Sequence, residues 1–393
     1  MFGRFSALSL LGRMFDQVLK KHTGRDENEV FSLVFHPSEQ ILLSGDVNGC
    51  IHFNLFDLDE KTCELPEGMG QSPFQPHKSE SCRSIDIIAT SNQIVSGGAD
   101  GRVIISSFDP QVVSKYKFDS AINVVTALSE SVVLAGNDDG VLLGIDVRMK
   151  KKIFSIHEQE DYITAIVPSY PFSSPLKSIV CTAGDCTVAV YDLRTLGASD
   201  DKKRKDRLVA MSDPQEDELN CAIVLNQEQN VLTGDADGVV GIWKQGYWGD
   251  LKDRIPLYNK GETPTGGMDG SHSIDGMKKI DEKKFLVATS DGIIRVVGLF
   301  PNEVERIVGV HRNSDETEIA TFSAFDCDVD LGIIATSAGD SEGRIKFWAL
   351  NAKEEPQSDA EEQVSAKKMK KPKRIDVTRN AEKASKQNFF SDL

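Results

Sequence analysis

The strongest constraint on the fold of this chain is a short hairpin pattern that occurs seven times in the sequence. In residues 96–109, SGGADGRVIISSFD, an apolar run is followed by a tight polar turn and a second apolar run. Glycine in the turn supplies the positive φ angle that such hairpins need. The pattern recurs at 42–57, 95–109, 134–148, 181–194, 232–246, 287–300 and 336–350. The sequence therefore predicts an array of similar antiparallel units.

The spacing of the turns indicates how large each unit is. The turn position is held by Gly49, Gly101, Gly140, Cys186, Gly238, Gly292 and Gly343. Neighbouring positions in this series lie 39 to 54 residues apart, which fits a four-stranded blade of about 40–45 residues with loop insertions. Alternating segments such as EVFSLVFHP (29–37) and YITAIVPSY (162–170) precede the hairpins and predict a further strand in each unit.

The units resemble the WD repeat, most clearly at GVVGIWKQG (238–246) and GRIKFWAL (343–350). Seven copies imply an all-β, seven-bladed WD-repeat β-propeller over residues 14–350. Residues 1–13 are expected to be flexible, and the composition of residues 351–393 predicts a disordered, lysine-rich tail.

Closure of the ring requires one more strand than the last hairpin supplies. That hairpin ends at Leu350, which leaves the final blade with three strands and an open edge. FDQVLKKH (15–22) is placed to provide the fourth strand, over residues 15–21. The arginines and the lack of acids before Asp16 are also typical of a targeting segment, and Met14 is an alternative start. We favour the strand.

An aspartate accompanies every turn. The seven are Asp46, Asp100, Asp139, Asp185, Asp237, Asp291 and Asp340. A residue that recurs in every blade is expected to stabilise the blade itself. The symmetry also places the seven aspartates far apart around the ring, so they do not form one common site. Short Asp side chains accept hydrogen bonds from nearby backbone N–H groups. We therefore predict a structural role in the turns, with neither metal binding nor acid–base chemistry.

The sequence offers no credible catalytic or cofactor-binding constellation. Phosphate-binding loops, HExxH and nucleophile elbows are missing, and seven scattered cysteines lack paired zinc spacing. Apolar stretches are too short to span a membrane. A net charge of −16 argues that the body is not a general nucleic-acid or membrane binder. These observations favour a binding scaffold without cofactor, metal or small-molecule substrate.

Three stretches resemble one branch of the WD proteins, the WD-repeat-containing protein 55 family. They are HKSESCRSI (77–85), residues 217–256 and residues 273–311, followed by GRIKFWAL and the lysine-rich tail. The resemblance implies a nucleolar protein that acts in pre-ribosomal RNA processing and large-subunit biogenesis. It also implies pre-ribosomal or nucleolar proteins as partners.

Within these stretches, QGYWGDLKDRIP (245–256) has the composition of an interface hot spot. The candidate partner-binding residues are Arg83, Tyr247, Trp248 and Arg254. The alternative interpretation is structural: Trp248 packs over the blade edge, and Arg254 pairs with Asp250 or Asp253. Arg83 would then pair with a carboxylate between blades.

Two basic runs stand out on an acidic chain and predict import into the nucleus. They comprise Lys202, Lys203, Arg204, Lys205, Lys367, Lys368, Lys370, Lys371, Lys373 and Arg374. The second run lies in the tail, where weak, salt-dependent RNA contact is a further expectation.

Two other functions compete with the nucleolar one. Some WD proteins act as substrate receptors of cullin–RING ubiquitin ligases through a Trp-Asp-x-Arg ending, and GIDVR (144–148) and VYDLR (190–194) retain Arg148 and Arg194 but lack the tryptophan. Local pairing of each arginine with its aspartate is the alternative. An acidic propeller rim would also suit the basic tails of histones, which gives a chromatin-binding function.

Overall fold

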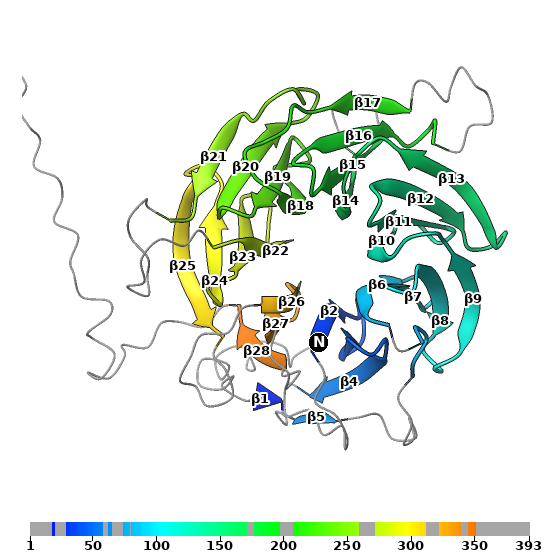
Figure 1. Cartoon of the computed structure of the whole chain (residues 1–393). Coiled ribbons are helices and arrows are strands. Elements are labelled where there is room, and N and C mark those ends of the chain that lie inside the picture. The colour runs from blue at the N-terminus through cyan, green and yellow to red at the C-terminus, as the bar shows by residue number, and fades with distance from the viewer. Residues whose placement is uncertain are drawn as a thin grey trace, which may run out of the picture. The chain divides into compact units, whose positions relative to one another are not determined.

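The computed structural model describes residues 18–19, 29–57, 62–64, 74–78, 80–170, 177–196, 207–258, 272–311, 322–338 and 345–350. Within them all regular elements are β-strands, and these form seven four-stranded antiparallel sheets. Figure 1 shows the sheets as blades around a common axis. The strands nearest the axis are β2, β6, β10, β14, β18, β22 and β26. The predicted all-β, seven-bladed propeller is confirmed.

The first four blades follow the chain from the inside outward. Blade one contains β2 (Val30–Phe35), β3 (Ile41–Asp46), β4 (Ile51–Asp57) and β5 (Thr62–Glu64). Blade two contains β6 (Cys82–Ile88), β7 (Gln93–Gly98), β8 (Arg102–Ser107) and β9 (Val112–Lys117). Blade three contains β10 (Ile122–Ala127), β11 (Val132–Asn137), β12 (Val141–Asp146) and β13 (Lys151–His157). Blade four contains β14 (Ile163–Ser169), β15 (Ser178–Ala183), β16 (Val188–Asp192) and β17 (Leu208–Met211).

The remaining three blades repeat this order, except at the last strand. Blade five contains β18 (Leu219–Leu225), β19 (Asn230–Asp235), β20 (Val239–Lys244) and β21 (Asp253–Pro256). Blade six contains β22 (Ile274–Lys279), β23 (Lys284–Thr289), β24 (Ile293–Gly298) and β25 (Glu303–Val310). Blade seven contains β26 (Phe322–Asp328), β27 (Ile333–Ala338), β28 (Ile345–Ala349) and, from the other end of the chain, β1 (Val18–Leu19).

The position of a strand within its blade explains its composition. The middle strands β15 (SIVCTA) and β16 (VAVYD) are buried throughout, because neighbouring blades cover both faces of the sheet. Strands covered on both faces carry near-continuous apolar runs. The outermost strand β13 (KKIFSIH) is largely exposed and carries polar residues instead. Hydrophobic β-branched residues in the middle strands therefore specify the blade stacking.

The hydrophobic core of the described residues is divided among seven clusters, and each cluster lies between two neighbouring blades. No blade buries its own apolar faces without a neighbour, so the ring is the unit of stability. The cluster between blades seven and one is rich in aromatics: the ring centroids of Phe35 and Phe56 lie 5.7 Å apart, and those of Phe56 and Phe347 5.8 Å apart.

The two ends of the described chain meet in blade seven, as the sequence predicted. β1 pairs antiparallel with β28, with Val18 opposite Lys346 and Leu19 opposite Ile345. The described strand is two residues long. The remainder of the predicted 15–21 segment lies outside the described residues, as do residues 1–13 and the tail 351–393.

Hydrogen bonds between neighbouring inner strands reinforce the ring near the axis. Ser32 Oγ accepts from Ile85 N at 2.9 Å, and Asp86 Oδ2 accepts from Ala127 N at 2.7 Å. The bond that joins the last blade to the first runs from Phe35 N to Asp326 Oδ2 at 2.7 Å. Asp326 also forms an ion pair with Lys278 Nζ at 2.8 Å, so its carboxylate connects three blades.

The described part of the chain contains no helix of the length and hydrophobicity that a bilayer crossing requires.

We expect Asp326→Ala to lower the free energy of unfolding by about 2–4 kcal/mol. The substitution leaves the Phe35 N–H without its acceptor and Lys278 without its ion-pair partner. Asp326→Asn should cost less, because an amide oxygen can still accept from Phe35 N. Urea unfolding measures both. Asp330→Ala, at an exposed site in the same blade, is the control, and a loss no larger than its own would contradict the closing role of Asp326.

Candidate functional site

The hairpin turns between the second and third strands of the blades lie on one face of the propeller. All blades repeat the same strand order around the axis, so equivalent turns must point the same way. The fourth strand of one blade returns to this side before the next blade begins. We call it the turn face. It carries the candidate site because loops held on a rigid scaffold are the usual place for binding residues.

In three blades the turn aspartate lies directly before the turn position. Asp100 accepts from Arg102 N at 3.1 Å, Asp185 from Thr187 N at 3.0 Å and Asp291 from Ile293 N at 3.1 Å. The acceptor is the Oδ1 atom in all three, and the donor is the first residue of the following strand or its neighbour. These carboxylates close the turn as the sequence indicated.

In three other blades the hydrogen-bonded side chain lies two residues earlier. Asp46 Oδ1 accepts from Cys50 N, Asn137 Oδ1 from Val141 N and Asp235 Oδ1 from Val239 N, each at 2.7 Å. Asp139 and Asp237 lie in their turns, yet the bond that we assigned to them is made by Asn137 and Asp235. Both positions can reach the same N–H group, so the repeated acid alone does not identify the acceptor. Asp340 lies outside the described residues.

A buried histidine network supports the turn of blade two. His77 is fully buried, with Nδ1 3.0 Å from Asp100 Oδ1 and Nε2 2.8 Å from Ser96 Oγ. Burial is the largest single effect on the pKa of Asp100, and it acts to raise it. The hydrogen bond and charge of His77, together with the hydrogen bonds from Arg102, outweigh burial and lower the pKa overall. The carboxylate is thus held ionised inside a structural network.

A β-bulge interrupts the pairing of the innermost strand in every blade, at the end nearest the turn face. The register shifts between residues 30 and 32, 82 and 84, 122 and 124, 163 and 165, 219 and 221, 274 and 276, and 322 and 324. Bulges redirect a side chain out of the regular ladder. The bulged residues with described side chains are Phe31, Arg83, Asn123, Thr164, Asn220 and Asp275, and we call them the axial ring.

The axial ring differs in chemistry from blade to blade, whereas the turns are alike. Phe31 is 36% exposed, and Asp275 is exposed with its Oδ1 accepting from Ser273 Oγ at 2.6 Å. Desolvation and the nearby charge of Asp291 raise the pKa of Asp275 to about 6. The ring therefore combines an aromatic, a cation, amides and an acid on fixed strands.

Arg83 is the ring's cation and joins two blades. Its Nη1 donates to Asn123 Oδ1 at 2.5 Å and to Asp138 Oδ1 at 2.9 Å, both in blade three. The guanidinium is half-buried, so this ion pair contributes modestly to stability. The predicted inter-blade carboxylate partner is present, and the exposed part of the side chain remains accessible beside the axis.

Carboxylates gather on the turn face of blades three to five. We call them the acidic arc: Asp138, Asp139, Glu160, Asp161, Asp185, Asp217, Glu218, Asp235 and Asp237. Desolvation raises the pKa of Asp235 to about 6, and the charges of Asp217 and Asp237 add to the effect. Desolvation, followed by the charges of Glu218 and Asp185, raises the pKa of the Cys186 thiol. Burial is the main cause of both shifts, and the negative charges of neighbouring acids add to it.

The segment 245–256 places its two aromatics differently. Trp248 is only 6% exposed and packs into the core cluster between blades four and five, so the structural interpretation applies to it. Tyr247 is 68% exposed, and Lys244 Nζ lies 4.9 Å from its ring centroid. Of the two residues, Tyr247 is the one that a partner can reach.

The arginines that we singled out elsewhere have local carboxylate partners or lie exposed. Arg254 Nη1 pairs with Glu216 at 2.9 Å, not with the expected Asp250 or Asp253. Arg194 donates two hydrogen bonds to the Asp192 carboxylate, from Nε to Oδ1 at 3.0 Å and from Nη2 to Oδ2 at 2.7 Å. Arg148 is exposed in the turn that follows β12. The basic runs 202–205 and 367–374 lie outside the described residues.

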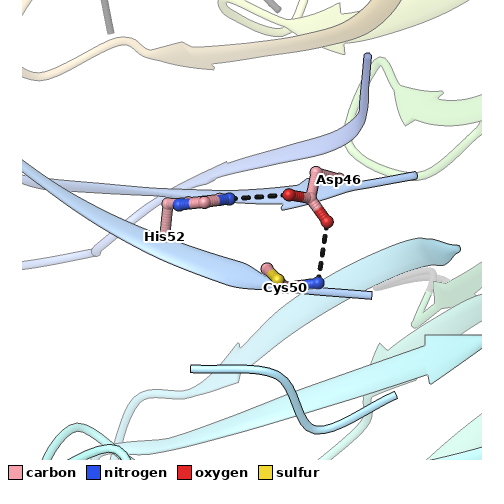
Figure 2. Close-up of side chains that lie close together, drawn as sticks. All are labelled: Asp46, Cys50 and His52. Atoms are coloured by element: carbon pink, nitrogen blue, oxygen red, sulfur yellow. Dashed lines mark hydrogen bonds and ion pairs between the residues drawn. The ribbon is translucent and has the colours of Figure 1, made fainter. Parts of the chain in front are cut away.

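The structure also brings together three residues that sequence reasoning missed. Figure 2 shows Asp46, Cys50 and His52 converging in the hairpin of blade one, with one ligand atom of each within 4.8 Å of the others. Asp46 had been assigned to the turn alone. The signal that could have found the group is its spacing, since a hairpin brings residues i, i+4 and i+6 together.

We expect Asp235→Asn to change how stability depends on pH. The raised pKa of Asp235 means that the folded protein binds its proton more tightly than the unfolded chain, so the contribution to stability is lost as pH rises from about 4 to about 6. The asparagine variant should therefore gain about 1 kcal/mol relative to the parent between pH 4 and pH 7. Thermal unfolding across this range measures it.

Asn137→Asp is the matched reverse substitution, because Asn137 fills the same position in blade three. It should introduce the pH-dependent loss that Asp235→Asn removes. Parallel pH profiles for the parent and both variants would contradict the assignment.

Comparison with known proteins agrees with this architecture. Residues 16–53 match the family model described as WD domain, G-beta repeat. WD repeat-containing protein 55 of Arabidopsis thaliana is 25% identical over 323 residues, which are 81% of this chain and 80% of that protein. The human protein of the same name is 23% identical, over 81% of this chain and 73% of its own length. WD repeat-containing protein JIP5 of Coprinopsis cinerea is 28% identical, over 72% of this chain and 65% of its own. The chain is thus a seven-bladed β-propeller with a WD-repeat match in its first blade, and it resembles WD repeat-containing protein 55 over about four-fifths of its length.

Proposed function

We propose that this chain is a non-enzymatic protein-interaction scaffold of the nucleolus, acting in pre-ribosomal RNA processing and large-subunit biogenesis. The observation that carries the scaffold role is the axial ring, whose side chains differ between blades while the strands that hold them repeat. A rigid platform with varied residues around its axis suits selective protein binding. The nucleolar role rests on the resemblance to the WD-repeat-containing protein 55 family.

The acidic arc defines the chemistry of the partner. Its carboxylates lie on the turn face of three consecutive blades, and the charges of Asp217 and Asp237 repel that of Asp235, which adds to the effect of burial on its pKa. A lysine- or arginine-rich protein segment would relieve this repulsion and be steered to the face by it. Basic extensions of this kind are the proposed ligands.

Nuclear entry is assigned to the two basic runs, 202–205 and 367–374. The second run also supplies a weak RNA contact in this proposal, and such a contact weakens steeply as salt rises. Small-molecule substrates and membranes have no part in it.

We expect depletion of the protein to cause large-subunit ribosomal RNA precursors to accumulate, and the parent chain to restore processing. Glu160→Lys combined with Asp237→Lys reverses two exposed charges of the acidic arc. This variant should fold but fail to restore processing, because it repels a cationic partner. Precursor blots and sedimentation of pre-ribosomal particles measure the outcome.

The control makes the same charge change on the opposite face. Glu130→Lys with Asp330→Lys alters two exposed acids in loops between first and second strands. It should restore processing as well as the parent. Normal processing after depletion would overturn the nucleolar role. Co-purification of nucleosomes without pre-ribosomal proteins would favour chromatin binding instead.

A further inference from the structure

The hairpin of blade one holds a group of side chains that the scaffold role does not use. Asp46 ends β3, Cys50 follows the turn glycine and His52 lies in β4. Asp46 Oδ1 accepts from Asn48 N at 3.0 Å and from Cys50 N at 2.7 Å, so one carboxylate oxygen fixes the turn. The other oxygen, Oδ2, lies 2.9 Å from His52 Nε2 (Figure 2).

The three side chains provide three different donor atoms at short range. A carboxylate oxygen, a thiol sulfur and an imidazole nitrogen all lie within 4.8 Å of one another. Asp46 is fully buried, Cys50 is 5% exposed and the His52 side chain is 11% exposed. A buried cluster of this composition matches the ligands that Zn²⁺ takes in proteins.

The other described blades lack this combination at the same positions. The residue after the turn position is Arg102, Val141, Thr187, Val239 or Ile293. The residue two further on is Ile104, Leu143, Ala189, Gly241 or Arg295. Thiol and imidazole are therefore departures from the blade pattern, which the propeller fold itself does not require.

Blade six shows how the position is used without a metal. Arg295 occupies the place of His52, and its Nη2 donates to Asp291 Oδ2 at 2.6 Å. A permanent cation there neutralises the turn aspartate as a structural ion pair. The His52–Asp46 contact taken alone is equally consistent with such a pair. The feature of blade one that an ion pair does not explain is the buried thiol beside it.

We propose that Asp46, Cys50 and His52 bind one Zn²⁺ ion. Asp46 Oδ2, Cys50 Sγ and His52 Nε2 are the ligands, while Asp46 Oδ1 keeps its bonds to the turn. Tetrahedral zinc with bonds of about 2.0–2.1 Å separates an oxygen and a nitrogen ligand by about 3.3 Å, so the imidazole must move outward by a few tenths of an ångström. Binding replaces the His52–Asp46 contact and releases the thiol proton to solvent. The proton that Nε2 donates to Asp46 must leave as well, so the imidazole binds zinc as the neutral tautomer that carries its hydrogen on Nδ1.

The ion would stiffen the joint between blades one and two. A Cβ atom at Gly49 would lie 1.9 Å from the carbonyl oxygen of His77, so the turn already packs tightly against the segment that leads into blade two. Fixing Asp46 and Cys50 through a common ion restricts this turn further.

Co²⁺ titration of the metal-free full-length protein tests the proposal. One equivalent should produce a sulfur-to-cobalt charge-transfer band in the near ultraviolet, and one equivalent of Zn²⁺ should abolish it. Zn²⁺ should also raise the thermal midpoint by several degrees, because it binds only the folded state.

Three substitutions identify the ligands. Cys50→Ser should remove the charge-transfer band and the zinc-induced shift. His52→Arg replaces the imidazole by a permanent cation that can still pair with Asp46, so it should retain the midpoint measured in EDTA while losing both metal responses. Asp46→Asn keeps an acceptor for the turn, as Asn137 does in blade three, and should weaken binding without unfolding the hairpin.

Cys327→Ser is the control and should leave both responses unchanged. Failure of the parent protein to bind Co²⁺ or Zn²⁺ at one equivalent would overturn the proposal. So would a band that survives Cys50→Ser and disappears in Cys82→Ser, whose thiol packs against Gly45 nearby. A His52→Arg variant that retains the full zinc-induced shift would show that the contact is an ion pair only.

Discussion

The propeller depends on the contact that joins its last blade to its first. Every apolar cluster of the described core lies between two blades, so an open ring would leave two sheet faces exposed to water. Three interactions close it: the β1–β28 pairing, the aromatic cluster around Phe35 and Phe347, and the bond from Phe35 N to Asp326 Oδ2. The bonded residues are 291 positions apart in sequence, so closure brings together opposite ends of the described propeller.

A closed ring allows the blades to differ at positions outside the apolar clusters between them. The middle strands are buried on both faces, and substitutions there disturb two neighbouring clusters at once. The bulged residues of the axial ring are free of this constraint because they leave the ladder. Arg83 in blade two and Asp275 in blade six occupy equivalent places with opposite charge. The side chains that differ most in chemistry between blades are thus those at the bulges, which lie outside the regular strand pairing.

The fold could be predicted from the sequence because glycine spacing and alternation record the blade directly. The need for a fourth strand in blade seven then followed from the cost of an unpaired edge. The site could not be predicted in the same way. A bulge appears in the sequence only as one extra residue, and its side chain can be of any type. Tyr247 and Trp248 are adjacent and both aromatic, yet only the three-dimensional packing of blades four and five separates the exposed ring from the buried one.

The turn carboxylates explain why fold and function overlap on this face. In Asp46, Asp100, Asp185 and Asp291, one oxygen accepts the backbone N–H that closes the turn, and the second oxygen has a partner that differs between blades. Asp100 Oδ2 accepts from Arg102, Asp185 Oδ2 from the backbone of Glu160, and Asp46 Oδ2 meets His52. The hydrogen bond to the turn is common to these aspartates and explains why an aspartate recurs in the sequence. The second oxygen gives each turn its own charge and chemistry, so removing a turn aspartate perturbs stability and surface together, whereas exposed acids beside it, such as Glu160, can be changed for the surface alone.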